Sequence, residues 1–84
     1  MSKIQQLIAA INVSVTQIDS QEMRIRDFNR RLEDMRSQID TVMGTENPSA
    51  QRMLSQISAT MDRNTETLRM LEAAKDRLRQ IQLV

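Results

Sequence analysis

The sequence predicts an all-α fold in which two long helices form an antiparallel, coiled-coil-like hairpin. Two observations predict it: apolar residues recur at every seventh position, and the only glycine and the only proline lie four positions apart. We expect one domain over residues 1–84, with a helix over 3–43, a turn over 44–47 and a helix over 48–82. A chain this short has a small core, so we expect oligomerisation or a partner to complete a helical bundle.

The first helix is predicted to begin just after Ser2, because Ser2 and Gln5 have the spacing of a capping box. From there two columns repeat every seven residues, the pattern of a coiled-coil seam. The first column is Ile4, Ile11, Ile18, Ile25, Leu32 and Ile39, and the second, three residues later, is Leu7, Ser14, Gln21, Phe28, Met35 and Val42. At about 1.5 Å per residue this helix is roughly 60 Å long.

The turn is predicted from three residues. Gly44 follows the apolar pair Val42-Met43, where a helix commonly ends with a left-handed residue. Asn47 can then cap the next helix, and Pro48 suits its first position, where the missing N–H has no partner to lose. A connection this short places the two helices antiparallel.

The second helix repeats the same heptad pattern. Its two columns are Leu54, Met61, Leu68, Lys75 and Gln82, and Ile57, Asn64, Leu71 and Leu78. Four polar residues therefore occupy predicted core positions in the two helices: Ser14, Gln21, Asn64 and Lys75. A polar residue in a coiled-coil core lowers stability but fixes register and oligomeric state, so we expect these four to set the register.

The stretch from Ile4 to Ile18 contains no charged residue, and its apolar stripe is wider than a two-helix hairpin needs. We interpret it as a partner interface made of Ile4, Leu7, Ile8, Ile11, Val15 and Ile18. The alternative is a fuller local core packed against Leu71, Leu78 and Ile81 of the second helix.

The composition favours a non-catalytic protein. Cysteine and histidine are absent, so the commonest metal ligands and the commonest acid–base group are missing, and a narrow rod offers no enzyme pocket. We therefore expect no catalytic, cofactor-binding or metal-binding residues. The net charge of +1 disfavours nucleic acid, and no apolar stretch is long enough to span a membrane. We expect a cytoplasmic protein, with export possible without a cleaved signal peptide.

Three family resemblances suggest functions. The size and the two long helices around Gly44 resemble the small helical-hairpin proteins and toxin partners of bacterial type VII secretion. The Trp-x-Gly turn of that family is absent here, and Gly44 alone marks the turn. This resemblance implies an adaptor or partner subunit that pairs with another helical protein. Asn47-Pro48 and the Lys75-Asp76-Arg77-Leu78 segment are similar to type III secretion needle subunits, which would imply a self-assembling structural subunit. Ile18-Asp19-Ser20-Gln21 resembles the central layer of a SNARE helix, which would imply a tethering coiled coil.

Overall fold

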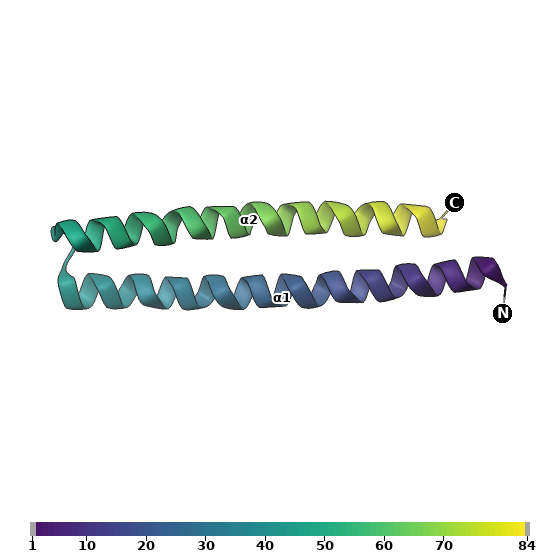
Figure 1. Ribbon diagram of the computed structural model, residues 1–84, viewed down its shortest axis with the longest axis horizontal. Helices are drawn as coiled ribbons and strands as arrows, with labels where there is room; N and C mark the ends of the chain where they lie inside the picture. Colours follow the sequence, from purple (N-terminus) through teal and green to yellow (C-terminus); the bar gives the residue numbers. More distant parts are fainter. Residues whose placement is uncertain (1, 84) are drawn as a thin grey trace.

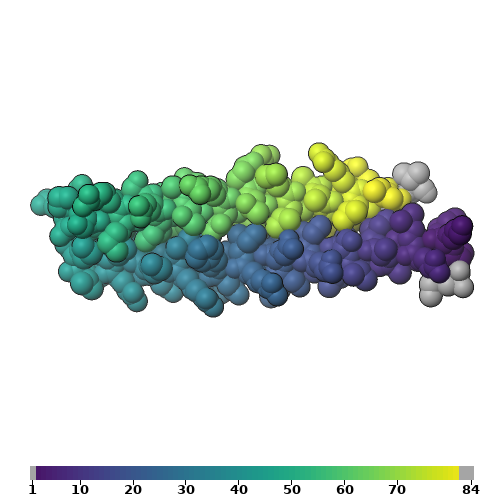
Figure 2. All heavy atoms as spheres, in the orientation of Figure 1, coloured from purple at the N-terminus to yellow at the C-terminus, as the bar shows by residue number. Residues whose placement is uncertain are grey.

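The computed structural model describes residues 2–83 and confirms the all-α hairpin. It contains two helices, α1 (Lys3–Met43) and α2 (Pro48–Leu83), packed against each other in antiparallel orientation. They lie side by side in a rod of 63 × 16 × 13 Å, and the start of α1 and the end of α2 lie at the end opposite the turn (Figure 1). Figure 2 shows the side chains of the two helices meeting along the rod.

The N-terminus of α1 has the predicted capping box. The Gln5 backbone N–H donates to Ser2 Oγ at 3.1 Å, and the Ser2 N–H donates to Gln5 Oε1 at 3.3 Å. At its other end the helix stops at Gly44, whose N–H donates to the Asp40 carbonyl oxygen at 3.2 Å. Gly44 has φ 79° and ψ 157°, a backbone region that is essentially restricted to glycine. The position of the only glycine therefore fixes where α1 ends.

Asn47 starts α2 as its N-cap. Its side-chain oxygen accepts hydrogen bonds from the backbone N–H groups of Ser49 at 2.9 Å and Ala50 at 3.2 Å. Gln51 Nε2 also donates to the Thr45 carbonyl oxygen at 3.1 Å, which ties α2 back to the turn. These bonds satisfy groups that a helix start leaves unpaired, so the chain can reverse direction within a few residues.

The main apolar cluster lies in the half of the rod next to the turn. Its buried members are Leu32 and Ile39 of α1 and Ala50 and Ile57 of α2, and three partly buried residues pack against it: Met43, Leu54 and Met61. Ala50 is fully buried, and its small side chain allows the two helices to approach closely beside the turn. Toward the other end, among the side chains of residues 2–81, Ile11 is the one further buried apolar residue.

The seam of α1 differs from the one expected from its sequence. α2 covers two columns of α1. One is the first heptad column, as expected. The other lies four residues after it, whereas the sequence predicted the column three residues after it. The covered residues are Ile11, Val15, Ile18, Glu22, Ile25, Asn29, Leu32, Arg36, Ile39 and Met43, all buried or half-buried. In the expected second column only Ser14 is half-buried; Leu7, Gln21, Phe28, Met35 and Val42 are exposed.

Polar pairing across the seam accounts for this difference. Columns three and four residues away both adjoin the first column, and one helix can cover only one narrow stripe. The covered column contains Glu22 and Asn29, which pair with Lys75 and Asn64 of α2. Rotating α1 to bury Phe28 and Met35 would remove these partners from the polar residues of α2. The seam of α2 follows the two expected columns from Leu54 to Leu78 and extends them to Ala50, whereas the side chain of Gln82 lies outside the described part.

Candidate protein-interaction face

One long face of the rod carries no charge in the two columns that border the seam. We call it the uncharged face. It consists of the exposed column of α1 and the column of α2 that begins at Met53: Leu7, Ser14, Gln21, Phe28, Met35 and Val42, with Met53, Thr60, Thr67, Ala74 and Ile81. The bordering columns on the opposite side include the charged residues Asp19, Arg26, Glu33, Asp40, Glu72 and Arg79. The two sides of the hairpin are therefore chemically different.

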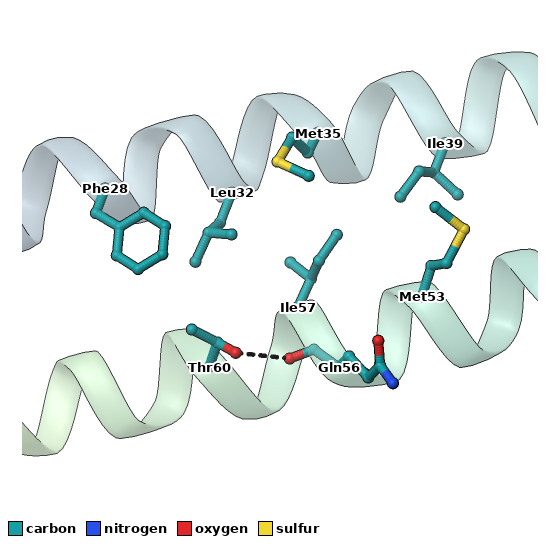
Figure 3. Close-up of a pocket in the computed structure, with 8 residues that line it drawn as sticks. All are labelled: Phe28, Leu32, Met35, Ile39, Met53, Gln56, Ile57 and Thr60. Carbon is teal, nitrogen blue, oxygen red and sulfur yellow. Dashed lines mark hydrogen bonds between the residues drawn. The ribbon is translucent and has the colours of Figure 1, made fainter.

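The uncharged face is hollowed in the half next to the turn. Phe28 and Met35 of α1 and Met53 and Thr60 of α2 line an open groove of 220 Å³ (Figure 3). Leu32, Ile39 and Ile57 also line it. A neighbouring hollow of 230 Å³ shares Met35 and Met53 and reaches Val42 beside the turn. We call the two hollows together the turn-end groove.

The side chains around this groove are large, apolar and open to solvent. Phe28 is 47% exposed, Met53 is 41% exposed and Val42 is 82% exposed. Removing apolar surface from water favours association, Phe supplies a large apolar contact area, and the flexible side chain of Met adapts to the shape of a partner. Because they line a shallow elongated groove, their arrangement suits the apolar stripe of another helix.

The other end of the rod exposes apolar residues for a geometric reason. The cross-helix pairs Asn29–Asn64 and Asp19–Lys75 set the register of the hairpin. Figure 1 shows α1 extending past the end of α2 at this end of the rod, and Ile4 and Leu7 belong to the first two turns of α1. Both are more than half exposed.

The residues expected to form a partner interface are consequently divided between two environments. Ile11 is buried in the seam, and Val15 and Ile18 are half-buried there against α2. The other three are exposed: Ile4, Leu7 and Ile8. Of the six, only Leu7 belongs to the uncharged face. Phe28, Met35 and Val42 were predicted as seam residues and not as interface residues. The sequence signal for an interface there is the lack of charge in both bordering columns.

Two of the four expected register-setting residues pair across the seam. Asn64 Nδ2 donates to Asn29 Oδ1 at 2.7 Å in a partly buried position. Lys75 is buried and reaches three carboxylates, as described next. Ser14 is half-buried at the edge of the seam, whereas Gln21 is exposed on the uncharged face and lies outside the core. Gln21 is exposed because α2 covers the column that holds Glu22.

The ammonium group of Lys75 lies among three carboxylates. Its Nζ is 2.6 Å from Glu22 Oε1, 2.8 Å from Asp19 Oδ1 and 2.9 Å from Glu72 Oε2. Hydrogen bonds to Asp19, then to Glu22 and Glu72, raise the pKa of Lys75 well above its usual value. The hydrogen bond from Lys75 likewise lowers the pKa of Glu72. Glu22 is 2% exposed, and its Oε2 has no hydrogen-bond partner within the described residues. This cluster joins the two helices far from the turn.

Over residues 2–83, neither helix has the length and hydropathy required to cross a membrane. The same part of the chain contains no group of three or more acidic side chains arranged to hold a metal ion. No protein-family model, curated protein or solved structure matches the sequence.

Proposed function

We propose that this protein is a small, non-catalytic helix–helix interaction protein that binds a protein partner through its uncharged face. The observation that carries the proposal is the turn-end groove, where Phe28, Met35, Val42 and Met53 remain exposed although their helices are already paired. Contiguous exposed apolar surface of this kind is typical of protein interfaces.

The dimensions of the rod also support this proposal. The rod is 63 Å long, so a partner helix can lie along the uncharged face over many turns. The narrower form of the proposal is an adaptor or partner subunit of a bacterial protein-secretion system. The hairpin architecture and the length of 84 residues support that form, in keeping with the resemblance described above.

The test compares substitutions on and off the face. Phe28→Gln with Met35→Gln removes apolar surface from the groove, and Val13→Gln with Met23→Gln is the matched control, because these two residues are exposed but lie off the uncharged face. Affinity-tagged chains are expressed in the source cells, and the bound proteins are identified by mass spectrometry. We expect the control to retain the same partner as the wild type and the groove variant to lose it.

Equal recovery by both variants would reject the uncharged face as the binding surface. For the secretion role, deleting the gene should block export of the recovered partner, and normal export would contradict it. Light scattering on the purified chain separates the alternatives: long polymers would favour a needle-like subunit. A chain that becomes ordered only when other helices are added would favour a tether.

A further inference from the structure

The columns just outside the uncharged face are basic on both helices. Arg24 and Arg31 lie beside it on α1, where both line a surface hollow with Phe28. Arg63 and Arg77 follow Gln56, which lines the groove on α2, at heptad spacing. We call these four arginines the basic rims. The remaining residues of their columns are Lys3, Ala10, Gln17 and Gln38 on α1 and Ser49, Gln56 and Met70 on α2, so neither column contains an acid.

The arginines of the basic rims have no ion-pair partner in the described part of the chain. Within residues 2–83, none of the four arginines forms a salt bridge or hydrogen bond. Arg30, Arg36, Arg69 and Arg79 are each paired with a nearby acid, whereas Arg26 and Arg52, which lie off the rims, form no salt bridge. Asp27, which lines the hollow between Arg24 and Arg31, is itself paired with Arg30 at 3.1 Å. Arginine is well suited to carboxylates at an interface because its planar group donates two parallel hydrogen bonds.

We propose that the partner on the uncharged face is a helical protein whose apolar stripe is flanked by glutamate or aspartate. The inference rests on the proposed function, since it names the partner of the same face. An apolar stripe would fill the turn-end groove, and its flanking carboxylates would pair with the basic rims. Such complementarity raises the association rate and selects among helical partners.

The same charges argue against a second copy of the chain on this face. Two hairpins can pack face to face around a two-fold axis that runs either across the rod or along it. In the first arrangement the Arg24–Arg31 rim meets its own copy, and in the second it meets the Arg63–Arg77 rim. Both arrangements bring arginines together, and Asp27, the acid that lines the hollow between Arg24 and Arg31, is already paired with Arg30, so the contact is unfavourable.

The experiment uses the hairpin itself as the acidic partner. A variant carrying Arg24→Glu, Arg31→Glu, Arg63→Glu and Arg77→Glu keeps the uncharged face but has acidic rims. Sedimentation equilibrium is measured on the wild type, on the variant and on their mixture. We expect each alone to be a monomer and the mixture to form a one-to-one complex. Raising NaCl from about 50 mM to about 500 mM should weaken this complex about tenfold or more, because salt screens the rim pairs.

A matched control carries the same change of charge away from the rims. Arg26→Glu, Arg30→Glu, Arg52→Glu and Arg69→Glu should not pair with the wild type, and circular dichroism verifies that every variant is helical. If the fourfold rim variant is unfolded, Arg24→Glu with Arg31→Glu applies the same test to the rim of α1 alone. No complex in the mixture, or equal pairing by the control, would overturn the acidic partner.

Adding Phe28→Gln and Met35→Gln to the acid-rimmed chain separates the two proposals. We expect this addition to abolish pairing; if pairing persists, the complex does not use the uncharged face, and both proposals fail. If the wild type dimerises by itself and loses that dimer with the same two substitutions, only the acidic partner is rejected, in favour of a second copy. If the wild type instead floats with phosphatidylcholine–phosphatidylserine vesicles and these substitutions prevent it, a lipid surface replaces the protein partner and both proposals are rejected.

Discussion

Lys75 of α2 is joined to the buried carboxylate of Glu22 in α1, with 2.6 Å between Nζ and Oε1. Both side chains are nearly inaccessible, Lys75 at 6% exposed and Glu22 at 2%. An ion pair withdrawn from water gains little over an apolar pair of similar size, but either charge left alone there is strongly unfavourable. The pair therefore acts mainly on register: any slip of α2 along α1 that separates these two residues leaves a charge in the seam.

Removing one partner of this pair should destabilise the hairpin more than removing both. We expect Lys75→Leu to lower the melting temperature by several degrees, because it leaves the buried Glu22 carboxylate without its partner. Glu22→Leu should lower it less, because Lys75 keeps its ion pairs with Asp19 and Glu72. Glu22→Leu with Lys75→Leu should recover most of the loss. Thermal unfolding followed by circular dichroism gives all three values. If the double variant is as unstable as the less stable single variant, the ion pair itself stabilises the hairpin relative to two leucines.

The acid side of the stability profile should depend on Glu72. Lys75 lowers the pKa of Glu72 below its usual 4.5, so the unfolded chain takes up the proton first as the pH falls. The contribution of Glu72 to the free energy of unfolding is therefore complete above pH 4.5. It is lost as the pH falls through the pKa that Glu72 has in the folded state. The pKa of Lys75 is raised from 10.5, so its contribution is complete below that pH and disappears only in stronger alkali.

We consequently expect a broad stability plateau between these two limits, with a decline on the acid side. Glu72→Gln should make that acid decline shallower in urea titrations at several pH values. Glu46→Gln is the control, because Glu46 lies in the turn and forms no salt bridge within the described residues. An acid decline equally steep in Glu72→Gln and the wild type would show that other carboxylates control it.

Gly44 should be intolerant of a side chain because of its backbone conformation and not because of space. No atom lies within 4 Å of where a Cβ would be, yet its φ of 79° is one that L-residues rarely adopt. We expect Gly44→Ala to cost about 1–3 kcal/mol in the free energy of unfolding. The neighbouring Thr45→Ala supplies the comparison in the same turn. A loss at Gly44 no larger than that at Thr45 would indicate that the turn relaxes to another conformation.

The turn and the buried face of α2 can be predicted from the sequence. Which face of α1 is buried cannot. Gly44, Asn47 and Pro48 act locally, so their effects could be predicted from neighbouring residues alone. Which face of α1 is buried depends on partners in α2: Glu22 is covered because Lys75 lies opposite it. A charged residue in a heptad is ordinarily assigned to the surface, so the column containing Glu22 was not recognised as part of the seam. The exposed position of Phe28 follows from the same long-range pairing.

Substitutions of Asn29 and Asn64 should have effects on stability that depend on each other. Asn64→Leu alone leaves the Asn29 amide without its partner in a half-buried position, which offsets the gain from burying leucine. Asn29→Leu with Asn64→Leu removes both amides, so we expect the double variant to be more stable than either single variant. Chemical denaturation of the wild type, the two single variants and the double variant gives the coupling free energy between the two sites. Strictly additive effects would contradict the hydrogen bond.

The last prediction tests which column of α1 is buried. Leu32 and Val42 are both apolar and both lie in predicted seam columns, but Leu32 is in the buried cluster and Val42 is 82% exposed. Leu32→Ala should lower the free energy of unfolding by about 2–5 kcal/mol, because it removes buried methyl groups and leaves a cavity. Val42→Ala should change it by no more than about 0.5 kcal/mol, as is usual for surface substitutions. Urea unfolding at a concentration where the chain is monomeric measures both, since association through the uncharged face would add a cost at Val42. Similar losses at the two positions in the monomer would mean that α1 is rotated in solution, with the Phe28 column in the seam and the Glu22 column outside.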